Sequence, residues 1–190
     1  MQKEFIFYNF EMMCYYLLKE LERKTNVNPD TIKIFLNQEP EKYNAYAFYD
    51  KKEKEIKVNL NDFTRFILNE SEFREELGRG FDFLIAHEIG HYIHDVYFQE
   101  EGFSFSDKNK IPNSYKNKNE DFADCFADWL INNKETKERN NDMEKILLEK
   151  GLLKYWFKND KGFIFFKNNV MIKEEYGIIK GVKEWILRNC

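Results

Sequence analysis

Residues 87–91 are His87-Glu88-Ile89-Gly90-His91, and this stretch decides how the rest of the chain is interpreted. It matches the pattern H-E-x-x-H and contains two of the three histidines in the sequence. On a helix, side chains four residues apart lie on one face, so both imidazoles can bind one metal ion. Glu88 lies about 100° further round the helix, where it can reach a water on that ion. The motif therefore predicts a metal centre with a carboxylate beside it.

The residues around the motif follow the period of a buried amphipathic helix. No proline interrupts the apolar positions on either side, which are Phe81, Phe83, Leu84, Ile85, Ile89, Tyr92, Ile93 and Val96. Gly90 costs such a helix about 1 kcal/mol relative to alanine. We therefore expect another backbone, or the metal pocket, to approach closely there. The alternative is a helix with two histidines that are merely packed or exposed.

Two histidines and a water leave a tetrahedral Zn²⁺ one protein ligand short. The third histidine, His94, does not supply it through the long zincin pattern, which would need His or Asp where the chain has Tyr97. Glu120 is a better candidate because it belongs to a second amphipathic segment, whose apolar positions include Phe122, Phe126 and Trp129. We expect this segment to form the second helix of the site.

That second helix is predicted over Asn119–Leu130 and carries one stripe of Glu120, Ala123, Asp124 and Ala127. Glu120 can be the third ligand, and Asp124, one turn later, can accept the free ring N–H of either histidine. The two alanines keep the stripe thin enough for the first helix to approach. The alternative is an exposed acidic stripe, which is where charged helix residues usually lie.

The two motifs together resemble the ImmA/IrrE family of zinc metallopeptidases, within the thermolysin-like gluzincins. The resemblance rests on residues 83–91 and on Glu120-x-x-Ala123-Asp124-x-Phe126-Ala127, includes the strand-like residues 56–60, and spans roughly residues 45–131. The chain departs from the family after the second helix, where Leu130-Ile131-Asn132-Asn133 replaces a stretch similar to Leu-Met-Pro.

The resemblance implies an α+β, zincin-like fold with a small, mainly antiparallel sheet packed on the H-E-x-x-H helix. The sheet edge would hold an extended substrate by strand addition. Zn²⁺ is the implied cofactor, with His87, His91 and Glu120 as ligands, Glu88 as the catalytic base for peptide hydrolysis, and Asp124 as a second-shell partner. Since no histidine remains to stabilise the oxyanion, the candidates for that role are Tyr46, Tyr92 and Tyr115.

The family resemblance also implies a substrate, a helix-turn-helix transcriptional repressor, and a regulatory role that is often linked to mobile elements. The main alternative is a non-catalytic zinc-containing binding protein, such as an antirepressor or a toxin/antitoxin-type partner that acts by contact. A zinc hydrolase that is not a protease is a third possibility. An intact Glu88 favours catalysis, because a structural zinc site needs no base.

Composition limits these interpretations. With 190 residues, 43% of them hydrophobic, we expect a single domain over 1–190, with a core of about 30–133 and an extension of about 134–190. The net charge of −4 argues against direct nucleic-acid binding. Three widely spaced cysteines indicate a reducing compartment, and no signal peptide or membrane-spanning run is apparent, so we expect a cytoplasmic protein.

The remaining elements frame the motifs. An amphipathic helix is predicted to end before Asn28-Pro29, and strands are predicted over 32–36, 45–49 and 55–60. Residues 99–118 are expected to be a mobile loop. The predicted C-terminal extension is a helix–hairpin–helix, with a helix near 142–150, a hairpin over 153–167, and a last helix on Ile178, Ile179, Val182, Trp185 and Ile186.

Overall fold

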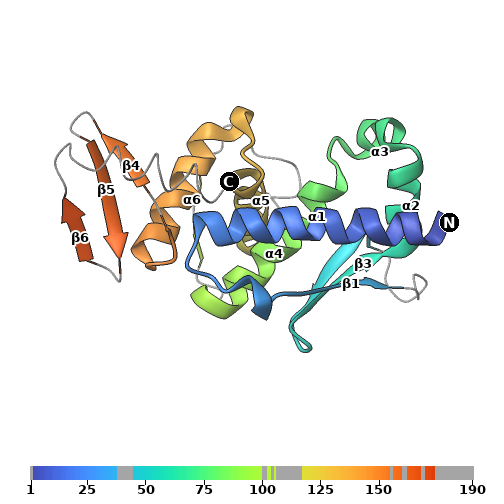
Figure 1. Cartoon of the computed structure of the whole chain (residues 1–190), viewed down its shortest axis with the longest axis horizontal. Helices are drawn as coiled ribbons and strands as arrows, with labels where there is room; N and C mark the ends of the chain where they lie inside the picture. Colours follow the sequence, from blue (N-terminus) through green and yellow to red (C-terminus); the bar gives the residue numbers. More distant parts are fainter. Residues whose placement is uncertain are drawn as a thin grey trace.

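The structure of the protein is a computed structural model that describes residues 2–37, 45–99, 102–103, 105, 117–154, 156–159, 162–167 and 170–173. It has an α+β fold in which helices predominate (Figure 1). The α-helices are α1 (Gln2–Lys24), α2 (Leu60–Leu68), α3 (Glu70–Leu77), α4 (Phe81–Phe98), α5 (Lys118–Leu130) and α6 (Lys137–Glu149). Short 3-10 turns, η1 (Pro29–Thr31) and η4 (Lys134–Thr136), precede β1 and α6.

A three-stranded sheet lies in the N-terminal half, with strands in the order β1 (Lys33–Asn37), β3 (Glu55–Asn59), β2 (Ala47–Asp50). The sheet is mixed, because β1 pairs with β3 in parallel and only β2 pairs with it antiparallel. The prediction of a mainly antiparallel sheet is therefore corrected. A tight turn fixes the direction of β2 against β3, whereas β1 has no local connection to β3 that could fix its direction.

Helix α4 is the centre of the structure. It begins after Gly78, whose φ of +68° ends α3 in the left-handed conformation, and it ends at Gln99, whose φ is +50°. Its apolar side chains are buried on several sides, and the sheet, α1 and α5 all contact it. Figure 1 shows α1 lying across α4 and α5, where it buries Phe10, Leu17 and Leu21 in the same core. This burial accounts for the apolar stripe of α1.

Helix α5 is buried along almost its whole length, from Asp121 to Leu130. Three of its carboxylates are therefore removed from water, and each has a partner. Asp121 pairs with Arg139 of α6 at 2.6 Å, and Asp128 pairs with Arg79, just before α4, at 2.7 Å. Asp124 contacts Nδ1 of His87 at 2.8 Å. Because buried charges are retained only when they are paired, these contacts fix the position of α5.

The three predicted strands agree with the structure to within two residues at each end, and the largest difference lies between β3 and α4. Residues 60–77 form α2 and α3, which were not predicted. The last predicted strand ends one residue early because the side chain of Asn59 accepts the N–H groups of Asn61 and Asp62 and so caps α2. The sequence signal for α2 was the spacing of Phe63, Phe66 and Ile67, which follows the period of a helix.

The C-terminal prediction is only partly covered by the described residues. Helix α6 starts earlier than predicted, at Lys137. Strands β4 (Trp156–Asn159), β5 (Gly162–Lys167) and β6 (Val170–Lys173) pair in that order, each antiparallel to the next. The predicted helix near 178–186 and most of the predicted loop over 99–118 lie outside the described residues. No helix in the described ranges is both long and apolar enough to cross a membrane.

Candidate metal centre

The candidate site lies where α4 and α5 pack most closely. A Cβ added to Gly90 would come within 2.9 Å of the Cα of Ala123, a distance that real side chains do not adopt. The predicted close approach at Gly90 is thus confirmed, and the approaching group is the backbone of α5. Ala123 and Ala127 are both fully buried in this contact, as the thin stripe on α5 suggested. Small residues on both helices bring the functional side chains within reach of each other.

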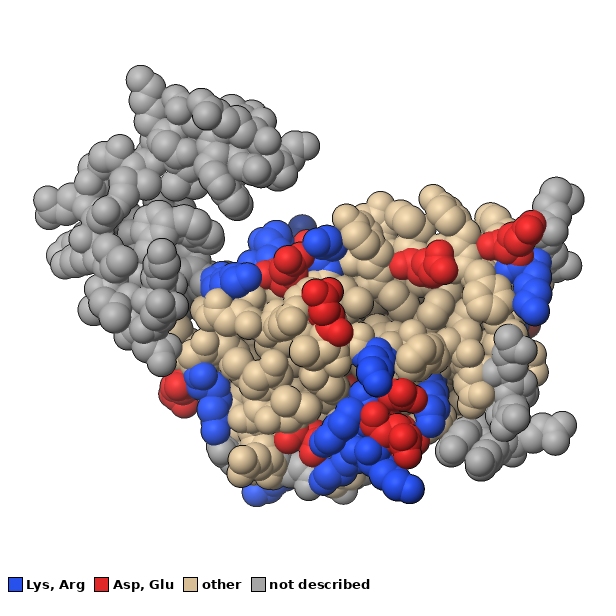
Figure 2. Space-filling model, turned by 60° about the horizontal axis from the view of Figure 1, so that its bottom comes forward, with Lys and Arg blue, Asp and Glu red and all other residues tan. Residues whose placement is uncertain are grey.

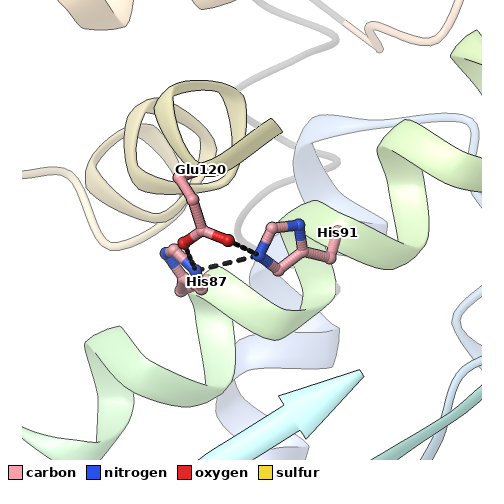
Figure 3. Close-up of side chains that lie close together, drawn as sticks. All are labelled: His87, His91 and Glu120. Atoms are coloured by element: carbon pink, nitrogen blue, oxygen red, sulfur yellow. Dashed lines mark hydrogen bonds and ion pairs between the residues drawn. The ribbon is translucent and has the colours of Figure 1, made fainter. Parts of the chain in front are cut away.

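Three side chains from the two helices converge, His87 and His91 from α4 and Glu120 from α5 (Figure 3). The Nε2 atoms of the two histidines are 3.0 Å apart. The carboxylate oxygens of Glu120 lie 3.3 Å from Nε2 of His87 and 3.5 Å from Nε2 of His91. Ligands about 2.0–2.1 Å from one tetrahedral ion lie roughly 3.3 Å apart, so this donor set fits a Zn²⁺ ion.

The start of α5 places Glu120 in this position. Asn117 caps the helix, since its side-chain oxygen accepts the N–H of Glu120 at 2.9 Å. Glu120 consequently lies in the first turn, where a carboxylate also interacts favourably with the helix dipole. Asp124 follows one turn later on the same face and is buried, with 2% of its surface exposed.

Asp124 orients one of the two histidines. Its Oδ1 is 2.8 Å from Nδ1 of His87. When Nδ1–H donates to this carboxylate, Nε2 carries the lone pair and faces His91 and Glu120. The structure thus brings Asp124 to the position predicted for it, and the histidine it contacts is His87.

Glu88 lies beside the three converging side chains, but its carboxylate contacts the sheet. Its side chain is buried, and Oε2 accepts the backbone N–H of Tyr49 at 2.7 Å. Tyr49 is in β2, an edge strand of the N-terminal sheet, and its N–H points away from β3 towards α4. The edge strand therefore holds the carboxylate that the sequence predicts to be the base.

The charges of the site shift its pKa values in opposite directions. Burial alone would lower the pKa of His87, but hydrogen bonds to Asp124 and Glu120 outweigh it and raise that pKa to about 10. Hydrogen bonds from the two histidines hold the pKa of Glu120 far below its usual range. Burial raises the pKa of Glu88, although nearby His87 and His91 and the Tyr49 N–H oppose the shift. Without metal, the site is an imidazolium held between carboxylates.

The pocket around these groups encloses about 340 Å³. It is lined by the metal-site residues and by residues of the adjoining strand and turn, namely Phe48, Tyr49, Lys51, His87, Glu88, His91, His94, Asp95, Asn119 and Glu120. Asp95, one turn after His91 on α4, accepts the hydroxyl of Tyr49 at 2.7 Å and also hydrogen-bonds to Lys54. Tyr49 is therefore attached to α4 at both its backbone and its side chain.

The tyrosines predicted to stabilise an oxyanion do not line this pocket where the structure describes them. Tyr92 is buried and donates its hydroxyl to Thr31, and Tyr46 packs edge to face on Phe73. Those two predictions are corrected, while Tyr115 lies outside the described residues. His94 is buried and stacks on Phe122, with the ring centroids 4.4 Å apart.

The contributors to the pocket that were not predicted include the Tyr49 backbone, Asp95 and Lys51. Asp95 could have been found, because it is four residues after His91 and so lies on the same face of the helix. Almost any residue provides a backbone N–H, so the sequence at position 49 does not reveal this contact. The role of Tyr49 follows from how the sheet packs on α4.

Comparisons of the chain with protein-family models, with curated proteins and with solved structures found no match. The resemblance to the ImmA/IrrE family therefore rests on the two motifs alone.

Proposed function

We propose that the protein is a zinc-dependent metallopeptidase of the zincin type. The observation that carries this proposal is the convergence of His87, His91 and Glu120 in a pocket that also contains the buried carboxylate of Glu88. A site built only to hold a structural ion has no use for a non-ligand carboxylate beside it. The donor set of two imidazoles and one carboxylate is that of catalytic zinc sites, which keep one position open.

His87, His91 and Glu120 would hold the ion. When bound, Zn²⁺ would lower the pKa of a water to about 7 and polarise the substrate carbonyl. The residues of the chain supply the rest of the reaction. Asp124 keeps the His87 ring in the required tautomer. Glu88 would take the proton of the attacking water as a general base and then deliver it to the leaving amine nitrogen as a general acid.

The edge strand β2 is the proposed place of the substrate backbone. It is the strand that lies next to the pocket, and Phe48 and Tyr49 contribute to the pocket wall. An extended peptide can add to such an edge through main-chain hydrogen bonds. Because Glu88 already accepts the N–H of Tyr49, a substrate that adds as a strand would either displace this contact or pair with β2 beside it, in both cases next to the proposed base.

The proposed substrate, which rests on the family resemblance, is a helix-turn-helix repressor cut in a linker or a locally unfolded segment. The acidic balance of the chain, −4, agrees in sign with a basic DNA-binding partner. We expect little activity on casein. Incubation of the zinc-loaded protein with the repressor encoded nearby, followed by mass spectrometry of fragments, tests this. Digestion of unrelated unfolded proteins with the repressor left intact would contradict the regulatory role.

Glu88→Gln separates catalysis from contact. Glu88 is not one of the converging ligands, so we expect the variant to keep its zinc and fold and to lose hydrolysis. The matched control is Glu75→Gln, which makes the same change at an exposed position of α3. If Glu88→Gln acts on the repressor as well as the native protein does, a contact-only binding role replaces the peptidase.

A further inference from the structure

The outer edge of β2 carries backbone groups that face away from β3. Asn59 donates its N–H to the carbonyl of Tyr46 at 2.8 Å, so these two residues form a hydrogen-bonded pair of the β2–β3 ladder. Such pairs alternate along an antiparallel ladder, and Tyr49, three residues after Tyr46, falls on a position whose N–H and C=O face outward. A peptide that adds to this edge as a strand would use that N–H as a donor.

Glu88 already accepts this N–H. Its Oε2 lies 2.7 Å from the nitrogen of Tyr49, and only 9% of the surface of Glu88 is exposed. Among the described residues, no second hydrogen bond holds the carboxylate. A residue has one backbone N–H, so Tyr49 can donate fully either to Glu88 or to a substrate carbonyl. The proposed base and the substrate backbone therefore compete for one donor.

Strand β2 has a separate attachment that does not depend on this N–H. The hydroxyl of Tyr49 donates to Oδ2 of Asp95 at 2.7 Å, and Lys54 pairs with the same carboxylate. Asp95 lies about two turns after Glu88 on α4. Figure 2 shows basic and acidic side chains gathered where the tip of the β2–β3 hairpin of Figure 1 comes forward. A change of acceptor at the N–H thus requires rotation of the Glu88 side chain and no movement of β2.

We propose that Tyr49 is a positioning residue whose N–H holds Glu88 until a peptide pairs with β2, when a substrate carbonyl takes the place of the carboxylate. The inference rests on the proposed peptidase function and names its substrate class, a segment that is extended over several residues beside the scissile bond. Short peptides that do not reach β2 leave Glu88 held. Because this remote contact acts on the base, shortening a substrate should lower kcat and not only raise KM.

Hydrogen exchange tests the competition without turnover. The Tyr49 amide is followed by NMR in zinc-loaded protein that carries a nitrogen isotope label in tyrosine, and Tyr49→Phe assigns its signal. Glu88→Ala should speed its exchange by about tenfold or more, because a hydrogen bond to a charged group is worth roughly 10- to 100-fold in an equilibrium constant. Glu75→Ala, at an exposed position of α3, is the control and should leave the exchange unchanged. Equal exchange in Glu88→Ala and the native protein overturns the inference.

Peptide probes show whether a substrate backbone takes the donor. The probes are hydroxamates of alanine peptides, one residue or about six residues long, in two series that extend on either side of the metal-binding group. In Glu88→Ala, the long probe of one series should slow exchange of the Tyr49 amide about tenfold or more, and the short probes should change it less than twofold. If neither long probe protects the amide, the inference is wrong.

Tyr49→Pro and Tyr49→Ala assign the kinetic effect to the N–H. Both variants lose the ring and the hydroxyl, but only proline lacks the N–H, and an edge strand tolerates proline where that group faces outward. The substrates are peptides of about four and about twelve residues that span the cleaved bond of the repressor. In Tyr49→Ala, kcat should be about tenfold higher for the long peptide, and in Tyr49→Pro the two values should agree within about twofold. A length dependence of kcat that survives Tyr49→Pro overturns the inference.

The two measurements distinguish failure of this inference from failure of the peptidase proposal. If the exchange results are as expected and no peptide is hydrolysed, the peptidase is refuted and the competition for the Tyr49 N–H is supported. If Tyr49→Ala hydrolyses long and short peptides with equal kcat, the peptidase is supported and the role of the N–H is refuted.

Discussion

The pocket has two walls, and they are held together in different ways. The α4–α5 wall is a helix contact in which Gly90 meets the backbone of Ala123 and buried side chains are paired across the interface. The β2 wall is a strand edge, attached to α4 through the two contacts of Tyr49 and flanked by an exposed, charged turn. The first arrangement sets distances between ligands. The second leaves the surface on which we propose that a substrate lies.

This difference predicts that changes in the α4–α5 wall alter metal binding, whereas changes in the β2 wall alter the substrate side of the pocket. The largest effect should come from Glu120→Ala, which removes one of the three proposed ligands and leaves two histidines. Zinc affinity, measured by competition with a chromogenic chelator, should fall by more than the roughly 10- to 100-fold of a second-shell change. A variant with native zinc affinity would show that Glu120 is not a ligand.

Asp124→Ala tests the contact that orients the His87 ring in the same wall. The carboxylate contacts Nδ1 of His87 and is itself buried, so its loss frees the imidazole to rotate and to change tautomer. Zinc affinity should fall about 10- to 100-fold. Glu144→Ala, which alters a carboxylate of α6 that contacts Trp129, is the control for a general effect of losing charge near α5. Equal losses in both variants would refute a specific role for Asp124.

Gly90→Ala tests the close contact between α4 and α5. A methyl group would meet the backbone of Ala123 at 2.9 Å, which rigid helices cannot relieve without moving apart. Overpacking costs about 1–3 kcal/mol, against a gain of about 1 kcal/mol in helix propensity, so unfolding in urea should show a net loss. Val96→Ala, at an exposed position of α4, is the control. A stabilised Gly90→Ala protein would mean that the two helices are less closely packed.

The α4–α5 wall could largely be predicted from sequence because its determinants are local. The spacing of His87 and His91 and the stripe of Glu120 and Asp124 follow from the helical period alone, and Gly90 marked the close approach. What had to be inferred was only that the two stripes face each other. Small residues on both stripes made that pairing favourable.

The β2 wall could not be predicted in the same way. The contact of Glu88 is a backbone N–H, which any residue at position 49 would provide. The parallel pairing of β1 with β3 depends on the path of the chain between two strands that are far apart in the sequence. The alternation of apolar and polar residues within each strand does not determine that path. The oxyanion candidates Tyr46 and Tyr92 were chosen by residue type, but packing on Phe73 and a hydrogen bond to Thr31 direct them elsewhere.

The pKa of His87 gives a prediction on pH. In the metal-free protein, hydrogen bonds to carboxylates raise this pKa to about 10, so the ring is protonated near neutral pH and must lose that proton to bind zinc. Zinc affinity should therefore increase with pH below 10, by up to about tenfold per unit, with release of a proton. Calorimetry in buffers of different ionisation enthalpy measures the proton release. A zinc affinity that does not change with pH would contradict the prediction.

The effect of pH on the stability of the metal-free protein has the opposite sign to its effect on zinc affinity. Because folding raises the pKa of His87 above its ordinary value of about 6.5, the protonated ring stabilises the fold. This stabilisation is fully present below about pH 6.5 and is lost as the pH rises towards 10. Urea unfolding of the metal-free protein at several pH values measures this loss. His87→Gln should remove it, because glutamine does not titrate.

The smallest expected effect is that of Tyr49→Phe, which tests whether the two walls are independent. The variant loses the hydroxyl that donates to Asp95 but keeps the ring against Tyr92 and the backbone N–H that holds Glu88. Asp95 retains its contacts with Lys54 and Lys51, so the loss should be about 1 kcal/mol in the free energy of unfolding. Zinc affinity should change less than twofold, because no ligand or second-shell contact is touched. Tyr8→Phe, at an exposed position of α1, is the control for removing a phenol. If zinc affinity fell tenfold in Tyr49→Phe alone, β2 would help to set the ligand geometry, and the separation between a metal-holding wall and a substrate-holding wall would be wrong.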